Sequence, residues 1–193
     1  MNGSTLMDFA ILDAIQEHLR SPFLDAVMPF VTHLGDLGIV WLVTAAVLVA
    51  QPKRRVYGIA VVVALLLTVV VGSLVLKPLV GRMRPYDVVG GFPLLIPPPT
   101  GDSFPSNHSM ASFAAATVIC LLPRAGRGVT AAKIGAIVVA ALIAFSRLYL
   151  YVHFPSDILV GAVLGVALGF AAVALAKRFM PQPKPPAGGA VHP

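Results

Sequence analysis

The chain has 193 residues, of which 58% are hydrophobic and only 11% are charged, whereas a soluble domain has about 45–50% apolar and about 25% charged residues. With a mean hydropathy of +0.88, this composition excludes a soluble globular protein and indicates one that spans a membrane. The net charge of +6 does not indicate nucleic-acid binding, because the 14 basic residues lie in short clusters between apolar runs. The single cysteine, Cys120, excludes a disulfide framework and a multi-cysteine metal site.

Residues 1–20 are predicted to form an amphipathic helix that lies at the membrane interface. Three acidic residues are interleaved with apolar residues at helical spacing, and no basic residue precedes Arg20. A cleavable signal peptide starts with a basic stretch, so we expect none here.

Residues 21–180 are predicted to form the membrane domain, an all-α bundle of six transmembrane helices, because helices satisfy their backbone hydrogen bonds within lipid. The five strongest segments are 37–51, 56–76, 106–122, 130–150 and 157–176. The sixth, residues 21–35, contains Asp25, Pro29 and His33, and a segment that enters the membrane and returns is the alternative for it. Residues 181–193 are rich in Pro, Gly and Ala, which predicts a disordered tail.

The basic clusters predict the orientation of the bundle. With six spans, the clusters at 53–55, 124–133 and 177–184 all fall on one face. By the positive-inside rule this face is cytoplasmic, and it includes Arg20 and both ends of the chain. The remaining basic residues, on the opposite face, are Lys77, Arg82, Arg84 and Arg147. The rule disfavours basic residues there, so these four need a different explanation.

Three polar clusters, residues 77–85, 104–108 and 146–157, share that opposite face in the predicted topology. Together they hold fixed cations, two histidines and one carboxylate. Cations that converge without acidic partners require an anion from outside the chain. A phosphate at the membrane surface fits, because Lys and Arg form charge-assisted hydrogen bonds with its oxygens.

The two histidines suit two different steps of phosphoryl transfer. Asp157 follows His153 by four residues, so its carboxylate can bond one ring nitrogen and leave the other to attack phosphorus. His108, near the start of the 106–122 helix, is then left to protonate the departing oxygen. Ser106 and the amides of Asn107 and His108 lie at that helix start, where unpaired N–H groups favour a bound anion.

Simpler interpretations remain open for several of these residues. Lys77 and Arg82, each taken alone, are typical of interfacial anchors, and Arg82 fits no pattern. His33 and His192 are interpreted as ordinary polar residues. The histidine–aspartate pair could be half of a metal site, but few acidic or sulfur ligands accompany it, so we expect no metal. A carrier for an anionic lipid is a further alternative, although transporter sites lie near the bilayer midplane.

Two features concern packing. Gly161, Gly165 and Gly169 form a stripe of small residues that we expect to pack inside the bundle rather than to mediate dimerisation. The loop at residues 86–103 is apolar and rich in proline. It is predicted to guide the hydrocarbon chain of a lipid, and capping of the bundle is the alternative.

The three clusters resemble the signature of the type 2 phosphatidic acid phosphatase family, whose core is related to that of the vanadium haloperoxidases. The family pattern is K-x6-R-P, then P-S-G-H, then S-R-x5-H-x3-D. It is matched here by Lys77 with Arg84-Pro85, by Pro105-Ser106-x-His108, and by Ser146-Arg147 with His153 and Asp157.

The resemblance implies a metal-independent phosphatase without a cofactor. It implies that His153 forms a phosphohistidine, that Asp157 orients it, and that His108 acts first as acid and then as base. The residues that it implies hold the phosphate are Lys77, Arg84, Ser106 and Arg147. Asn107 stands where the family usually has Gly, which questions how closely the main chain approaches the phosphate. A non-Gly residue there is similar to some bacterial undecaprenyl-diphosphate phosphatases of this family.

We therefore expect an integral lipid phosphatase of the plasma (inner) membrane, with its site on the periplasmic or extracellular face and the lipid bilayer and a lipid phosphate as its partners. Undecaprenyl diphosphate is the expected substrate. Phosphatidic acid and phosphatidylglycerol phosphate are the alternatives, and a lipid phosphotransferase, which passes the phosphoryl group to an acceptor other than water, also stays open.

Overall fold

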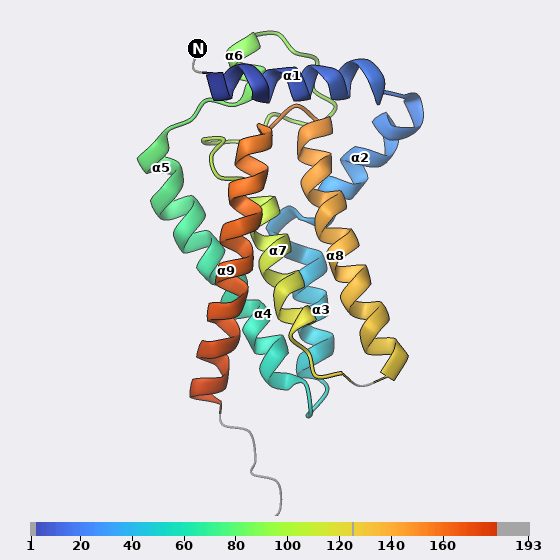
Figure 1. Ribbon diagram of the computed structural model, residues 1–193, viewed down its shortest axis with the longest axis vertical. Coiled ribbons are helices and arrows are strands. Elements are labelled where there is room, and N and C mark those ends of the chain that lie inside the picture. Colours follow the sequence, from blue (N-terminus) through green and yellow to red (C-terminus); the bar gives the residue numbers. More distant parts are fainter. Residues whose placement is uncertain (1–2, 125, 181–193) are drawn as a thin grey trace, which may run out of the picture.

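The computed structural model describes residues 3–124 and 126–180, and every regular element in these residues is a helix (Figure 1). In chain order these elements are α1 (Gly3–His18), α2 (Pro22–Leu34), the 3-10 turn η1 (Asp36–Gly38), α3 (Ile39–Val49), α4 (Arg55–Thr68), the π-helix η2 (Val69–Leu76), α5 (Lys77–Val80), α6 (Pro85–Val89), α7 (Asn107–Cys120), α8 (Gly126–Tyr149) and α9 (Pro155–Phe179). The predicted all-α fold class is confirmed. The predicted tail, residues 181–193, and His192 lie outside the described residues.

Helix α7 forms the centre of the bundle, where it packs against α9, α8 and α4 (Figure 1). Helix α9 approaches α7 closely because glycines, which have no side chain, lie at its contacts with α7. A Cβ atom at Gly161 would lie 2.8 Å from the carbonyl oxygen of Ser106, and one at Gly169 would lie 2.7 Å from that of Ala114. The expectation that these glycines, together with Gly165, pack inside the bundle is confirmed.

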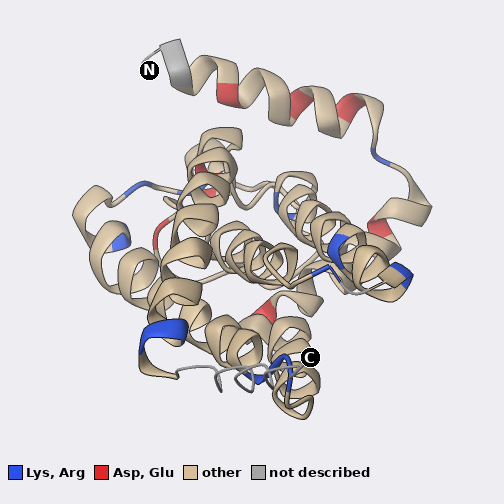
Figure 2. Ribbon diagram, turned by 60° about the horizontal axis from the view of Figure 1, so that its bottom comes forward, with Lys and Arg blue, Asp and Glu red and all other residues tan. Residues whose placement is uncertain are grey.

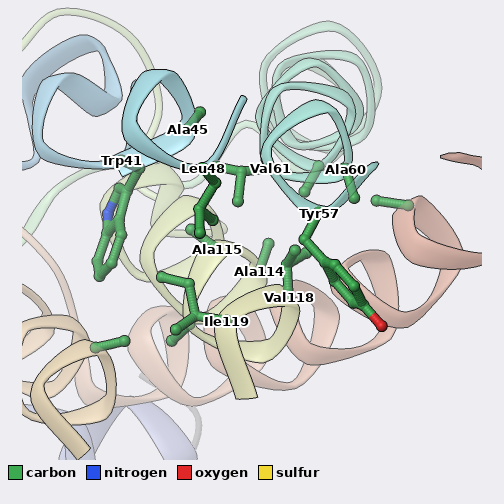
Figure 3. Close-up of a cluster of buried hydrophobic side chains, with 14 of the residues drawn as sticks. Trp41, Ala45, Leu48, Tyr57, Ala60, Val61, Ala114, Ala115, Val118 and Ile119 are labelled. Atoms are coloured by element: carbon green, nitrogen blue, oxygen red, sulfur yellow. The ribbon is translucent and has the colours of Figure 1, made fainter. Parts of the chain in front are cut away.

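The hydrophobic core lies where α3, α4 and α7 meet (Figure 3). Trp41 comes from α3, Tyr57 and Val61 come from α4, and Val118 comes from α7, and all four side chains are buried. The indole N–H of Trp41 donates to the hydroxyl of Ser112 at 3.1 Å, so its polar atom is satisfied inside the core. These contacts hold α7 in place and thereby fix the position of its first residues, which carry the second polar cluster.

The predicted count of six transmembrane helices is not confirmed. Among the described residues, three segments are long and apolar enough to cross a membrane by themselves, namely Arg55–Val89, Gly126–Tyr149 and Pro155–Phe179. Helices α2 and α3, which correspond to the predicted spans 21–35 and 37–51, reach that length only as a pair that bends by 50°. The chain bends at η1 instead of reversing, so two apolar runs form one broken segment. The predicted span 106–122 corresponds to α7, which has 14 residues and is not among these candidate spans.

Helix α1 lies across one end of the bundle, against the end of α8 and the start of α9 (Figure 1). The side-chain amide of Gln16 donates to the carbonyl of Tyr149 at 2.8 Å, and the main-chain N–H of Ser156 donates to Asp8 at 3.0 Å. Leu12 is buried beneath the helix, whereas acidic positions recur along it (Figure 2). Asp8 is also buried, whereas Leu6, Met7 and Ile11 are exposed, so the apolar and acidic residues of α1 do not separate onto two faces. The predicted amphipathic character of residues 1–20 stays a prediction.

The basic clusters lie at the opposite end of the bundle. The α3–α4 connection, the α7–α8 connection and the end of α9 carry them, and all three lie away from α1 (Figure 1). Arg20 is the exception, because it follows α1 and contacts Asp25 at 3.4 Å. The described residues begin at one end of the bundle and finish at the other. The predicted placement of both chain ends and Arg20 on the face of the basic clusters is therefore not confirmed.

The connection between α6 and α7 packs most of its large apolar side chains onto the bundle. The ring of Phe92 stacks on that of Tyr151, with centroids 4.0 Å apart and planes within 7°. Leu94 and Ile96 pack against a buried cluster at the end of α8, whereas Leu95 is exposed. This arrangement supports the capping role for the segment rather than the predicted guiding role.

Candidate active site

The three polar clusters meet at the end of the bundle that α1 covers. Arg84, in the first cluster, donates to the carbonyl of Val152 at 3.0 Å and lies 3.2 Å from Nε2 of His153, in the third cluster. The main-chain N–H of Ser106, in the second cluster, donates to the carbonyl of Asp157 at 3.2 Å. The first and second clusters therefore both contact the third, and the three form one site.

His153 lies in the connection between α8 and α9 and is 2% exposed. Its Nδ1 lies 3.5 Å from the Asp157 carboxylate and 3.4 Å from the Ser103 hydroxyl, whereas its Nε2 faces Arg84. A carboxylate beside Nδ1 favours a proton on that atom and leaves a lone pair on Nε2. Burial holds the pKa of His153 well below its usual value, and the charges of Arg84 and Arg147 lower this pKa further, against the opposing effect of Asp157. A lowered pKa favours the neutral imidazole, which is the nucleophilic form.

Asp157 is buried in the first turn of α9 and is held by three groups. Its Oδ2 accepts from the main-chain N–H of Phe154 at 2.9 Å and from Ser103 at 2.5 Å, and its Oδ1 accepts from Arg82 at 2.6 Å. Arg82 also pairs with Asp8 of α1 at 2.7 Å and lies 4.0 Å from the centroid of the Phe154 ring. The interpretation of Arg82 as an interfacial anchor is therefore wrong, because this side chain joins α1 to Asp157.

Arg147 is a buried cation with an unused hydrogen-bond donor. It lies in the last turn of α8, is 3% exposed, and donates through Nη1 to the hydroxyl of Thr32 in α2 at 2.5 Å. Its Nε is buried and has no hydrogen-bond partner among the described residues. None of the ion pairs between described residues includes Arg147. Such a guanidinium is unfavourable without an anion, so its surroundings suit a bound phosphate.

Arg84 and Lys77 hold the main chain that leads into the second cluster. Arg84 donates to the carbonyl oxygens of Gly101 at 2.9 Å, Thr100 at 3.2 Å and Asp102 at 3.3 Å. The ammonium of Lys77 also donates to the carbonyl of Asp102. Both cations therefore shape the wall of the site in addition to supplying positive charge to it.

The first turn of α7 forms a second wall. The hydroxyl of Ser106 accepts from the main-chain N–H of Ser109 at 3.4 Å and so caps the helix. The side chain of Asn107 turns toward η2, where it donates to Ser73 at 2.6 Å. Asn107 is in the helix and does not have a positive φ, so the main chain does not require glycine at this position. The first amides of a helix have no intrahelical partner, which suits an anion.

His108 contacts a carboxylate that the sequence analysis did not identify. Its Nε2 lies 2.9 Å from Oδ1 of Asp36, in the turn η1, and Oδ2 of Asp36 lies 2.6 Å from Nδ1 of His33. His33, interpreted from the sequence as an ordinary polar residue, is thus connected to the site through one carboxylate.

Other residues of the site also escaped the sequence analysis. Asp36 carried a recognisable signal, because an acidic residue inside an apolar stretch of a membrane protein indicates function. Thr32, Ser103 and Asp8 carried none, since single hydroxyl groups and an acid in an amphipathic helix are common. The roles of Asp8 and Thr32 follow only from the packing of α1 against α9 and of α2 against α8, and the role of Ser103 follows from the contact of the α6–α7 connection with Asp157.

A sequence model of the PAP2 superfamily matches residues 57–181 of the chain. This chain belongs to the PAP2 superfamily. The PAP2 match includes all three polar clusters. It begins after η1, so the contributions of α1, α2 and Asp36 to the site come from outside it.

Individual PAP2 proteins resemble most of the chain. An undecaprenyl-diphosphatase of Sulfolobus acidocaldarius is 32% identical over 151 residues, which cover 78% of this chain and 69% of that protein. A decaprenylphosphoryl-5-phosphoribose phosphatase of Mycobacterium tuberculosis is 32% identical over 168 residues, which cover 84% and 86%. The crystal structure of a transmembrane PAP2-type phosphatidylglycerolphosphate phosphatase from Bacillus subtilis superposes with a TM-score of 0.76 at 28% identity, over 95% of this chain and 90% of that one.

Proposed function

We propose that this PAP2 protein is a membrane phosphatase that hydrolyses lipid phosphates through a phosphohistidine on His153. The observation that carries the proposal is the environment of this one imidazole. It is buried, its Nδ1 faces Asp157, and its Nε2 faces the guanidinium group of Arg84. A nucleophile held by a carboxylate beside cations is the arrangement that phosphoryl transfer needs.

The phosphate binds among the cations in this proposal. Arg147 supplies the unused Nε donor, and Lys77 and Arg84 neutralise further oxygen charge. The amides at the start of α7, behind Ser106, supply neutral donors. Together these groups stabilise the charge that spreads over the equatorial oxygens in the transition state.

The first chemical step transfers the phosphoryl group to the protein. The lone pair on Nε2 of His153 attacks phosphorus, and the bond between phosphorus and the leaving oxygen breaks with its electron pair on that oxygen. His108 donates a proton to this oxygen. Asp157 stabilises the positive charge that develops on His153.

The second step returns the protein to its starting state. His108, now neutral, accepts a proton from a water molecule while the water oxygen attacks phosphorus. The bond between phosphorus and Nε2 breaks, and its electron pair returns to His153. Inorganic phosphate leaves, and each histidine regains its original protonation state.

Undecaprenyl diphosphate is the substrate that we propose. Two of the relatives described above are named for polyprenyl substrates, an undecaprenyl diphosphate and a decaprenylphosphoryl sugar phosphate. Asn107, in place of the usual Gly, supports the same choice. A similar structure is named for phosphatidylglycerolphosphate, so this glycerolipid is the alternative that an experiment must separate.

Purified protein in one detergent is expected to show a kcat/KM for undecaprenyl diphosphate at least about tenfold above those for phosphatidic acid and phosphatidylglycerol phosphate. Tenfold corresponds to about 1.4 kcal/mol of transition-state binding. Release of inorganic phosphate measures all three reactions. Equal values, or a preference for either glycerolipid, would contradict the proposed substrate and leave the phosphatase activity in place.

We also propose that the site faces away from the cytoplasm in a bacterial or archaeal plasma membrane. The basic clusters support this orientation, because they lie at the end of the bundle opposite the site. In contrast to the orientation derived from six spans, the arrangement of the described helices places α1 on the same side as the site.

Impermeant thiol labelling of intact cells tests this orientation. In a Cys120→Ala background, we expect cysteines at Pro98 and at Glu17 to be labelled from outside, since both positions are exposed at the site end. Lys53→Cys, at the opposite end, is the matched control and should react only after the cells are permeabilised. Labelling of Glu17→Cys with the Lys53→Cys pattern would place α1 on the cytoplasmic side and contradict the arrangement.

A further inference from the structure

The break between α2 and α3 places a carboxylate on the imidazole of His108. At the break, Leu37 has φ +52° and Gly38 has φ +70°, and η1 separates two helices that bend by 50°. A left-handed conformation is unfavourable for leucine, so the surrounding structure must hold the turn in this form. The result is that Asp36 lies 2.9 Å from Nε2 of His108.

The main chain next to this carboxylate also holds the imidazole. A Cβ atom at Gly35 would lie 2.7 Å from Cδ2 of His108 and 2.9 Å from a methyl group of Ile143. The ring of His108 therefore packs directly on the backbone of Gly35. Contact on its edge and a carboxylate on Nε2 together leave the ring little rotational freedom.

We propose that Asp36 is a positioning residue for His108, the proposed general acid and base, and that His33 in turn holds Asp36. The inference rests on the proposed function. Asp36 accepts the proton of Nε2, so Nδ1 is the atom of His108 that donates a proton to the leaving oxygen and later accepts one from water. His33, at 2.6 Å from the second carboxylate oxygen, fixes the direction of the carboxylate.

The charges of these groups agree with this role. Lys77, Arg84 and Arg147 are the cations of the site that have no carboxylate partner among the described residues. The buried Asp157 already contacts His153, Ser103 and Arg82. A protonated His108 among these cations needs a carboxylate of its own, and Asp36 is the carboxylate within hydrogen-bond distance of it in the described part of the chain. Asp36 thus does for the acid what Asp157 does for the nucleophile.

Leaving-group dependence tests this role, because a good leaving group departs without a proton. For Asp36→Asn we expect kcat/KM to fall 30- to 100-fold on a lipid alkyl phosphate and less than threefold on p-nitrophenyl phosphate. The constant kcat/KM reports steps up to the departure of the leaving group. Hydrolysis of the phosphohistidine still needs His108 as base, so kcat on p-nitrophenyl phosphate should fall and ³²P-labelled phosphoprotein should accumulate during turnover.

Two further variants make the experiment decisive. Asp25→Asn removes a carboxylate of α2 that contacts the Tyr149 hydroxyl at 2.7 Å, outside the site. It should change neither the ratio of kcat/KM between the two substrates nor the amount of ³²P-labelled phosphoprotein. His33→Gln leaves Asp36 in place. It is expected to lower kcat/KM on the lipid alkyl phosphate three- to tenfold and to affect p-nitrophenyl phosphate less, as Asp36→Asn does. If the Asp36→Asn protein does not fold, the His33→Gln protein still tests the inference.

Two results would overturn the inference, and they are distinguishable. Equal losses on both substrates without accumulation of label would show that Asp36 supports binding or folding and does not act through the acid. Turnover by the unmodified protein without any label on His153 would refute the proposed function itself, and the role of Asp36 with it.

Discussion

Replacing His153 by alanine is expected to lower kcat at least about 10⁴-fold and to abolish covalent labelling by a ³²P-labelled lipid phosphate. The side chain supplies the attacking nitrogen, and removal of a nucleophile has effects of this order. Labelling of the unmodified protein should be unchanged by a chelator, since the cations of the site are side chains. In the described residues, no three His, Cys, Asp or Glu side chains are grouped to hold a metal ion.

The control for this variant is a histidine at the same end of the bundle but outside the site. The side chain of His18 is 68% exposed at the end of α1, so we expect His18→Ala to keep both activity and label. Full activity of purified, folded His153→Ala would end the phosphohistidine mechanism. Loss of labelling on addition of a chelator would show that a metal takes part.

Replacing Arg147 by methionine is expected to abolish turnover and, at the same time, to make the unliganded protein more stable. The guanidinium is buried with an unpaired Nε and no ion-pair partner among the described residues. Exchange of a buried ionic group for an apolar one of similar length stabilises proteins by about 1–4 kcal/mol in favourable cases. For a chain of this size, each kcal/mol raises the melting temperature by about 2–4 °C. The Thr32 hydroxyl, which loses its partner, can bond to its own helix.

Thermal unfolding in detergent with and without vanadate measures both effects. Vanadate, a phosphate mimic, should raise the melting temperature of the unmodified protein and not that of Arg147→Met. Arg82→Met is the matched control, because Arg82 does pair with Asp8 and Asp157. Its removal leaves two buried carboxylates without their cation and should destabilise the protein by about 3–5 kcal/mol. If Arg147→Met destabilises the protein as much, then Arg147 is a structural residue.

Sequence analysis identified the residues of the site better than it identified the contacts between them. His108, His153, Asp157 and the cations are recognisable because each motif joins several of them within a few residues. Asp36 and Arg82 depend on contacts between segments far apart in the chain, and residue spacing carries no information about these. Arg82 and Arg84 show the limit clearly: two residues apart, one bonds carboxylates and the other bonds carbonyls.

The number of spans was the weaker part of the prediction, for a physical reason. Hydropathy identifies apolar runs but not whether the chain reverses between them. At residues 35–38, Leu37 and Gly38 adopt left-handed backbone conformations, and the chain bends by 50° and continues in the same general direction. One change in this count moves everything before it to the other face of the bundle. The error in the number of spans therefore also placed α1 on the wrong face of the bundle.

The position of α1 has a consequence for how the protein is made. In the proposed orientation, the α1 segment is carried across the bilayer during biosynthesis, before α2 and α3 settle in it. Lys and Arg retain a flanking segment in the cytoplasm, whereas Asp and Glu contribute little to this retention. Helix α1 contains three acidic residues and neither Lys nor Arg. The composition of α1 is thus that of a segment which can be translocated across the membrane. Lysines added to α1 should retain it on the cytoplasmic side.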